Sequence, residues 1–297
     1  MPTFYLRGMK YAAAALVLIV FAGTSARAGD VRPIVVELYT SQGCSACVPA
    51  DALAGKLAQR NDLIVMTLPV TYWDMFGWKD TLASDDNTRR QKAYAAALRH
   101  GGVYTPQMVI DGAKDVAGGR EDSVSYALDL AVLARDDGMQ PDEDTTPAIA
   151  KSDGLPKGDI AVVAGTRIKT WARSAWSVGV DLAKTPKTLR IAIARAPDTA
   201  KHSNVDATVW LFRMRSSATV RIGSGENAGR VATYRNVVTD IKSVGRWRGE
   251  PVAIDIPKPD PKATAAHDCI AVVVQQGGYG RVLGAASINQ ATFYAAR

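Results

Sequence analysis

The 297-residue chain has few of the side chains from which disulfide scaffolds and metal sites are built. It contains 3 Cys and 3 His, and the histidines are scattered at positions 100, 202 and 267. Three cysteines are too few for a disulfide framework, and a tetrahedral zinc site needs two ligands beyond one Cys-x-x-Cys pair. The cysteines therefore suffice for one redox pair and one spare thiol, and we expect neither a bound metal nor a cofactor.

Long hydrophobic runs are also scarce, since the only one lies at the N-terminus. Arg7 and Lys10 precede the uncharged residues 11–25, and Ala26-Arg27-Ala28 follows them as a small-x-small site. This run is shorter than the ~20 residues that span a bilayer, so we interpret residues 1–28 as a cleaved signal peptide. We therefore expect a periplasmic or secreted protein in an oxidising compartment. Once the signal peptide is cleaved, the protein should not span the membrane, and it should not bind nucleic acid.

The formal net charge of +7 hides an uneven distribution. Residues 29–148 hold 11 Lys+Arg and 18 Asp+Glu, a net of −7, whereas residues 149–297 hold 22 and 11, a net of +11. Two halves of such different charge predict two domains. The basic second half makes an anionic envelope surface a candidate contact, although a solvated charged face is the default interpretation.

The first half alternates strand-like and helix-like segments. Residues 33–40 and 63–68 are apolar and β-prone, and residues 46–60 between them have apolar side chains at helical spacing. This pattern predicts a β-α-β unit with parallel strands. Further segments are expected in this order: an aromatic loop over 72–78, a helix over 84–99, a strand over 107–110, a hairpin through Asp111 and Gly112 to 115–118, and a helix over 122–135.

The second half has a different period. Residues 136–150 are acidic, contain Pro141 and Pro147 and have little to bury, so we interpret them as a linker. Polar and apolar residues then alternate in about nine segments: 160–163, 176–182, 189–194, 208–214, 219–222, 231–244, 252–256, 269–274 and 282–286. The pattern predicts an α/β domain over residues 29–135, followed by an all-β sandwich or jelly-roll-like domain over residues 151–297.

Cys44 and Cys47 form a Cys-x-x-Cys motif between the first predicted strand and the first predicted helix. Unpaired N–H groups and the positive end of the helix dipole stabilise a thiolate there. We therefore predict that Cys44, as the more exposed thiol, is the nucleophile, with a pKa below ~8.5, and that Cys47 resolves the mixed disulfide. Structural zinc and a permanent structural disulfide are the alternatives.

Thr105 and Pro106 stand immediately before a short predicted strand. In thioredoxin-like folds a proline in this place is cis and lies against the active-site disulfide, and the preceding residue pairs with an extended substrate. We therefore predict a cis bond and a substrate-binding role for Thr105 and Pro106. An ordinary turn proline is the alternative.

The aromatic loop follows the second predicted strand, at the sheet edge where ligands of α/β proteins bind. Tyr72 and Trp73 are candidates for lining a groove for a peptide, and a folded-in loop core is the alternative. Two carboxylates are candidates for tuning the pKa of the thiols. Asp51 is a candidate proton acceptor for Cys47, against a solvated or capping role, and Glu37 is a candidate buried acid of the first strand.

Several motifs together resemble the DUF1223 family of secreted, thioredoxin-like proteins. They are residues 41–47, 49–51, 72–74, 77–80, 90–94 and 102–108 in the first half, and residues 225–230, 234–238 and 245–247 in the second. The resemblance implies a thioredoxin-like domain followed by a β domain, and no established substrate. Where the family usually has His-Val-Asp before the Tyr-Trp pair, this chain has Pro69, Val70 and Thr71, which argues against a metal-linked role.

The leading hypothesis is an exported thiol–disulfide oxidoreductase that acts on protein or small-molecule thiols and disulfides. The alternative is a non-catalytic extracytoplasmic binding module in which the Cys44–Cys47 disulfide is structural. A third hypothesis, a copper-handling protein, needs a ligand near Cys44, for which Met66 and Met75 are the candidates. Residues 223–229 are glycine-rich but lie between predicted strands, so we interpret them as a hairpin loop and not as a phosphate-binding loop.

Overall fold

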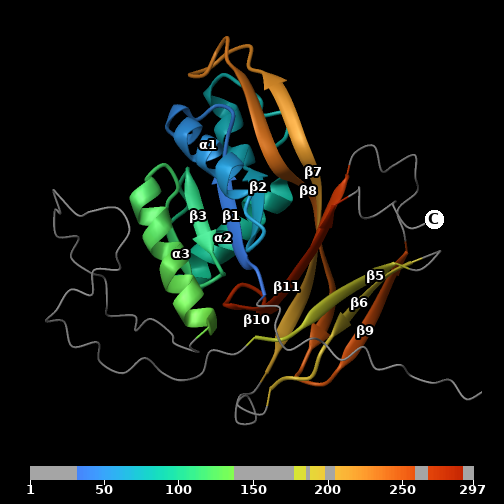
Figure 1. Cartoon of the computed structure of the whole chain (residues 1–297). Helices are drawn as coiled ribbons and strands as arrows, with labels where there is room; N and C mark the ends of the chain where they lie inside the picture. Colours follow the sequence, from blue (N-terminus) through green and yellow to red (C-terminus); the bar gives the residue numbers. More distant parts are fainter. Residues whose placement is uncertain (1–31, 137–176, 185–187, 198–204, 258–266, 290–297) are drawn as a thin grey trace, which may run out of the picture. The chain divides into compact units, whose positions relative to one another are not determined.

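The computed structural model describes residues 32–136, 177–184, 188–197, 205–257 and 267–289, all within one compact unit, Val31–Arg297 (Figure 1). The expected signal peptide, most of the expected linker and the expected strand over 160–163 lie outside these residues. No helix in the described part is long and apolar enough to cross a membrane.

The β-α-β unit predicted for the first half is present. Strand β1 (Ile34–Thr40) pairs in parallel with β2 (Leu63–Pro69) and antiparallel with β3 (Gln107–Ile110), which continues to β4 (Lys114–Ala117). The hairpin between β3 and β4 turns through Asp111 and Gly112, which both have positive φ. The helical segments are η1 (Ser45–Cys47), α1 (Val48–Leu57), η2 (Thr71–Phe76), α2 (Asp85–Ala97) and α3 (Glu121–Asp136).

Successive side chains of β1 point to opposite faces of the sheet, and both faces are buried. Ile34, Val36 and Leu38 pack with buried residues of α1 and α3 in a first core cluster. Val35 and Tyr39 pack on the other face with Tyr94 of α2 and with strands of the second half. Burial on both faces explains why residues 33–40 read as a continuous apolar run and not as an alternating one.

Strands of the second half extend the same sheet. They are β7 (Ala207–Arg221), β8 (Val231–Trp247), β10 (Cys269–Gln276) and β11 (Val282–Asn289), in the sheet order β11-β10-β7-β8-β2-β1-β3-β4. The junction is narrow, since Thr67 of β2 pairs in parallel with Val237 of β8. The Thr67 hydroxyl donates to the carbonyl of Arg235 at 2.7 Å, and Asn236 Nδ2 donates to the carbonyl of Val65 at 2.9 Å. The two halves therefore share one eight-stranded sheet.

A second, three-stranded sheet consists of β5 (Val180–Lys184), β6 (Thr188–Ile193) and β9 (Val252–Pro257). Its residues Leu189, Ile191 and Ile193 pack with buried residues of β7 and β10 in a third core cluster. The three-stranded sheet thus packs against the part of the eight-stranded sheet that the second half contributes (Figure 1). The strands expected over 208–214 and 219–222 are one strand, β7, which ends at Arg221. The molecule is a mixed α/β fold with a large β-sheet part.

Candidate functional site

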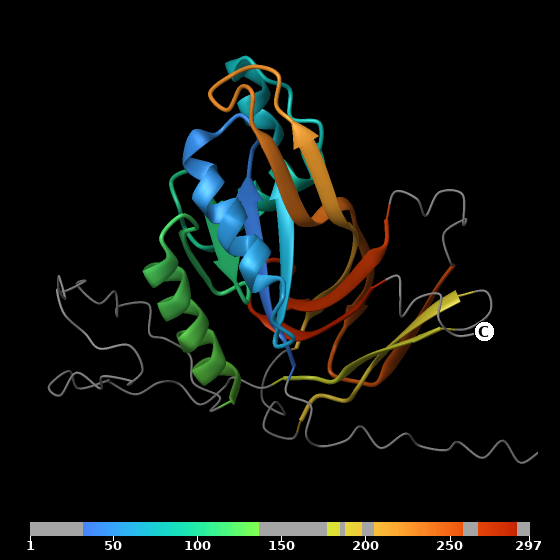
Figure 2. The same ribbon diagram turned by 45° about the horizontal axis from the view of Figure 1, so that its top comes forward.

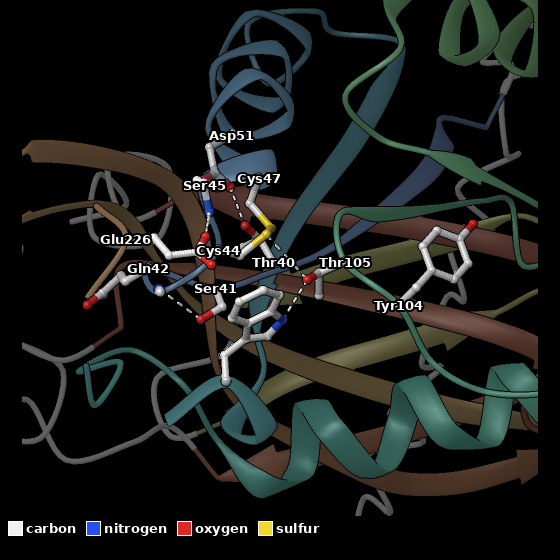
Figure 3. Close-up of a disulfide and its surroundings, with 12 residues drawn as sticks. Thr40, Ser41, Gln42, Cys44, Ser45, Cys47, Asp51, Tyr104, Thr105 and Glu226 are labelled. Carbon is white, nitrogen blue, oxygen red and sulfur yellow. Dashed lines mark hydrogen bonds between the residues drawn. A yellow bond between two sulfur atoms is a disulfide. The ribbon is translucent and has the colours of Figure 1, made fainter. Parts of the chain in front are cut away.

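The two cysteines of the Cys-x-x-Cys motif lie where β1 has ended and the first helical turn begins. Cys44 precedes η1, which Cys47 closes, and α1 continues from Val48 with Pro49 in its first turn, where proline suits a helix. Cys44 and Cys47 form a disulfide with Cα atoms 5.3 Å apart (Figure 3). Their neighbours Ser41 and Gln42 are buried as well. The two cysteines are therefore part of the packed structure, whereas Ser45 and Ala46 between them are exposed.

Both cysteines are shielded from solvent. The sequence predicted that Cys44 would be the more exposed of the two, but the relative exposure is 1% for Cys44 and 0% for Cys47. The expectation assumed that the helix start faces water, whereas residues from three other segments contact this region. The surrounding segments therefore cover Cys44 in this structure.

The first of these segments contains Thr105 and Pro106. The peptide bond between them is cis, as predicted from the sequence. The Thr105 hydroxyl donates to Cys44 Sγ at 3.5 Å and accepts a hydrogen bond from Trp73 Nε1 at 2.7 Å. Figure 3 shows Thr105 pointing at the disulfide. The structure thus brings together Cys44, Thr105 and Trp73, which are far apart in the chain.

The second segment is the aromatic loop, which forms η2. Tyr72 and Trp73 are partly buried against the second core cluster, whereas Met75 and Phe76 are 80% and 56% exposed. The rings of Trp73 and Phe76 lie 5.2 Å apart, so the exposed ring adjoins the one that bonds to Thr105. The loop therefore combines a packed side with an exposed apolar side. Of the two methionines considered as metal ligands, Met66 is fully buried in the second cluster and Met75 is exposed.

Asp51 lies one helical turn after Cys47. Its carboxylate accepts a hydrogen bond from the Thr40 hydroxyl at 2.7 Å. Burial raises the pKa of Asp51 to about 8, the Thr40 bond opposes this rise, and the Asp80 carboxylate adds to it. Burial also raises the pKa of Asp80, which accepts hydrogen bonds from the backbone N–H groups of Gln42 and Leu82 at 2.8 Å each. Two carboxyl groups with raised pKa values therefore flank the motif.

Glu37 lies on the other face of β1. Its carboxylate receives two hydrogen bonds from Arg90, at 2.6 and 2.9 Å, and one each from the hydroxyls of Tyr39 (3.0 Å) and Tyr94 (2.6 Å). Arg90 also donates to Gln275 Oε1 of β10 at 2.9 Å. These partners belong to the face with Val35 and Tyr39, whereas α1 packs on the opposite face. Asp51 is therefore better placed than Glu37 to exchange a proton with the cysteines.

The third segment is the loop between β7 and β8, residues 222–230, which the sequence did not link to the site. Glu226 Oε2 accepts a hydrogen bond from the Ser45 backbone N–H at 3.0 Å, and Asn227 Nδ2 donates to the carbonyl of Gln42 at 2.9 Å. These pairs are 181 and 185 residues apart, so no local pattern could have revealed them.

Cys269, the spare cysteine, lies half-buried in β10, where burial raises its pKa to about 11.

Comparison with known proteins gives the family and two similar structures. Protein AGR_C_4864 from Agrobacterium tumefaciens is 26% identical, with a TM-score of 0.64 over 89% of this chain and 96% of that one. HBP35 of Porphyromonas gingivalis, at 8% identity and a TM-score of 0.52 over 87% of this chain and 75% of that one, is similar in fold alone. No curated protein matches significantly. Residues 35–149 and 158–275 match DUF1223, a family described as of unknown function. The chain belongs to the DUF1223 family.

Proposed function

We propose that the protein is an exported thiol–disulfide oxidoreductase whose residues 29–135 form a thioredoxin-like domain. The observation that carries the proposal is the Cys44–Cys47 pair at the start of α1, with the hydroxyl of Thr105, next to the cis Pro106, 3.5 Å from Cys44 Sγ. The start of a helix favours a thiolate, which is the reactive form in disulfide exchange. A cysteine pair in this position can therefore form and break a disulfide with a substrate.

In the reducing direction, the Cys44 thiolate attacks one sulfur of a substrate disulfide. A mixed disulfide forms, and the other substrate sulfur leaves as a thiolate that takes up a proton. Cys47 then loses its proton and attacks Cys44 Sγ, which forms the Cys44–Cys47 disulfide and releases the second substrate sulfur. Two electrons and the one proton of Cys47 pass from this pair, a Cys44 thiolate and a Cys47 thiol, to the substrate, whose second sulfur leaves as a thiolate, and the reverse steps oxidise a substrate dithiol.

Asp51 is the proton acceptor in this proposal. It follows Cys47 by one turn, and its pKa of about 8 is close to the ~8.5 of a free thiol. A proton passes readily between groups of similar pKa, so the Asp51 carboxylate can take the proton of Cys47 and return it in the opposite direction.

Thr105, Pro106, Trp73 and Tyr72 hold the substrate in this proposal. The exposed side chains of Met75 and Phe76 add apolar surface beside Trp73, which suits an unfolded or extended peptide better than a small polar disulfide.

The proposed location is periplasmic or secreted, on the basis of the signal-like residues 1–28, and an anionic envelope surface is the proposed contact of the basic second half.

One observation favours a second candidate function. Both cysteines are almost completely buried, as in a disulfide that only stabilises a fold. In that case the protein is a non-catalytic binding module, and the exposed Met75 and Phe76 belong to its binding surface.

The test combines a reduction potential with substrate trapping. The Cys47→Ser variant cannot resolve a mixed disulfide, so an oxidoreductase is expected to accumulate a covalent complex with a disulfide substrate such as insulin. The Cys44→Ser variant is the matched control, because it keeps one thiol of the pair but not the nucleophile. A potential below about −300 mV together with no trapped partner would instead support the structural disulfide.

A further inference from the structure

The loop between β7 and β8 joins the two longest strands of the second half and reaches the end of the unit where α1 begins (Figures 1 and 2). Its backbone is held by its own hydrogen bonds, from Ile222 N–H to the carbonyl of Arg230 at 2.9 Å and from Gly229 N–H to the carbonyl of Ile222 at 2.8 Å. Gly225 and Gly229 have positive φ, which glycine adopts without strain. The loop therefore has a defined shape.

Three side chains of this loop bond to the segments around Cys44. Ser224 Oγ donates to the carbonyl of Gly77 at 2.5 Å, after η2. Asn227, which is 4% exposed, bonds to Gln42, and Glu226 bonds to Ser45. The loop thus contacts the chain on both sides of Cys44, at positions 42 and 45.

Glu226 brings a negative charge to the place where a Cys44 thiolate would be stabilised. Ser45 N–H is the first backbone donor after Cys44, and it bonds to the Glu226 carboxylate (Figure 3). The free N–H groups of the first turn stabilise a nearby anion, so a carboxylate and a thiolate compete for them. The Ser45 bond holds the pKa of Glu226 below its usual value, so the side chain is ionised at neutral pH.

We propose that Glu226 is a positioning residue through which the second half of the chain lowers the acidity of the Cys44 thiol and makes the Cys44–Cys47 pair more reducing. The inference rests on the proposed function and deepens it. Reduction consumes two electrons and one proton and leaves a Cys44 thiolate and a Cys47 thiol. The carboxylate repels that thiolate, so it favours the disulfide. Conversely, the thiolate repels Glu226 and weakens the hydrogen bond between this loop residue and Ser45 N–H.

Other titratable or charged groups around the motif are not changed in the test. They are Asp51 on α1, Asp80 after η2, and Tyr234 and Arg235 on β8, of which Arg235 packs against Gly55 of α1. Burial and the charges of Asp51 and Asp80 raise the pKa of Tyr234, so this hydroxyl stays neutral over the pH range of the test.

The experiment measures the pKa of Cys44 in the full chain. Alkylation by iodoacetamide is followed from pH 4 to pH 9 in Cys47→Ser and in Cys47→Ser with Glu226→Gln. Glutamine keeps the size and the hydrogen bond of Glu226 but removes its charge. We expect a lower Cys44 pKa in the glutamine variant and about three- to tenfold faster alkylation below that pKa. Because Glu226 is exposed, 1 M salt should shrink the difference.

Two further variants distinguish the effect of the Glu226 charge from the effect of the loop that covers Cys44. Glu250 lies between β8 and β9, and its exposed carboxylate pairs with Arg195. Glu250→Gln removes this charge and should leave the Cys44 pKa unchanged. Asn227→Ala loosens the loop without changing its charge, so it should raise the alkylation rate above the Cys44 pKa as well as below it, whereas Glu226→Gln should raise the rate only below it. With glutathione as the reductant, Glu226→Gln in the two-cysteine protein should shift the equilibrium toward the dithiol by about three- to tenfold.

Equal Cys44 pKa values with and without the Glu226 charge would overturn the inference. This readout needs no substrate, so it is independent of the proposed function. A shifted pKa without any trapped substrate would support the role of Glu226 and count against the oxidoreductase, whereas trapping with an unchanged pKa would remove only the role of Glu226.

Discussion

Replacing Asp51 by Asn should stabilise the oxidised protein, and the gain should grow with pH. The raised pKa of Asp51 means that the folded protein keeps this proton up to about pH 8, whereas an unfolded chain loses it near pH 3.9. Between these values the folded state binds more protons than the unfolded state, so stability falls as the pH rises. Asparagine resembles the neutral acid at every pH and can still accept the hydrogen bond of the Thr40 hydroxyl.

The magnitude follows from the slope of this dependence. One group that is protonated in the folded state and ionised in the unfolded state changes stability by about 1.4 kcal/mol per pH unit. From pH 5 to pH 7 the wild type should therefore lose about 2 to 3 kcal/mol relative to the asparagine variant. The upper figure applies to a fully shielded carboxyl, and the partial exposure of Asp51 reduces it.

The assay is urea unfolding of the oxidised protein at pH 5, 6 and 7, with the Cys44–Cys47 disulfide intact so that these two thiols do not titrate. Asp129→Asn, at an exposed carboxylate of α3, is the matched control and should show no such trend. A difference between wild type and Asp51→Asn that is the same at all three pH values would refute the assignment of the raised pKa to Asp51.

Three further predictions follow from the site and its supporting network. Glu37→Gln leaves the buried Arg90 without its carboxylate and should cost about 3 to 5 kcal/mol in urea unfolding, whereas Asp62→Asn, at an exposed ion pair with Arg60, should cost less than about 1 kcal/mol. Equal losses would argue against a buried network. Thr105→Val keeps the side-chain shape but removes the hydroxyl that contacts Cys44 Sγ and Trp73, so trapping of insulin by Cys47→Ser should slow by about tenfold. An unchanged trapping rate would exclude Thr105 from the reaction. Phe76→Ser should weaken the trapping of a protein disulfide but not the reaction with a small one, and an equal effect on both would exclude Phe76 from peptide binding.

The local features of the site were predictable from the sequence because they depend on short-range chemistry. Apolar β-branched runs and helical spacing located β1, α1, β2, α2, β3, β4 and α3 to within a few residues. The Cys-x-x-Cys spacing fits one helical turn, whereas the cis bond at Pro106 was expected only by analogy with thioredoxin-like folds. The positive φ values at Asp111 and Gly112 agree with the turn predicted from that pair.

Long-range packing determined the rest. Burial of Cys44, the pairing of Glu37 with Arg90 and the contact of Glu226 with Ser45 each depend on segments that meet only in the folded sheet. The sequence predicted an acidic half with a cysteine pair and a basic β-rich half, because composition and periodicity are local properties of the chain. Only the tertiary structure joined the halves through β2 and β8 and brought the glycine-rich loop to the cysteines, because strand pairing and side-chain contacts over more than 160 residues leave no periodic signal in one sequence.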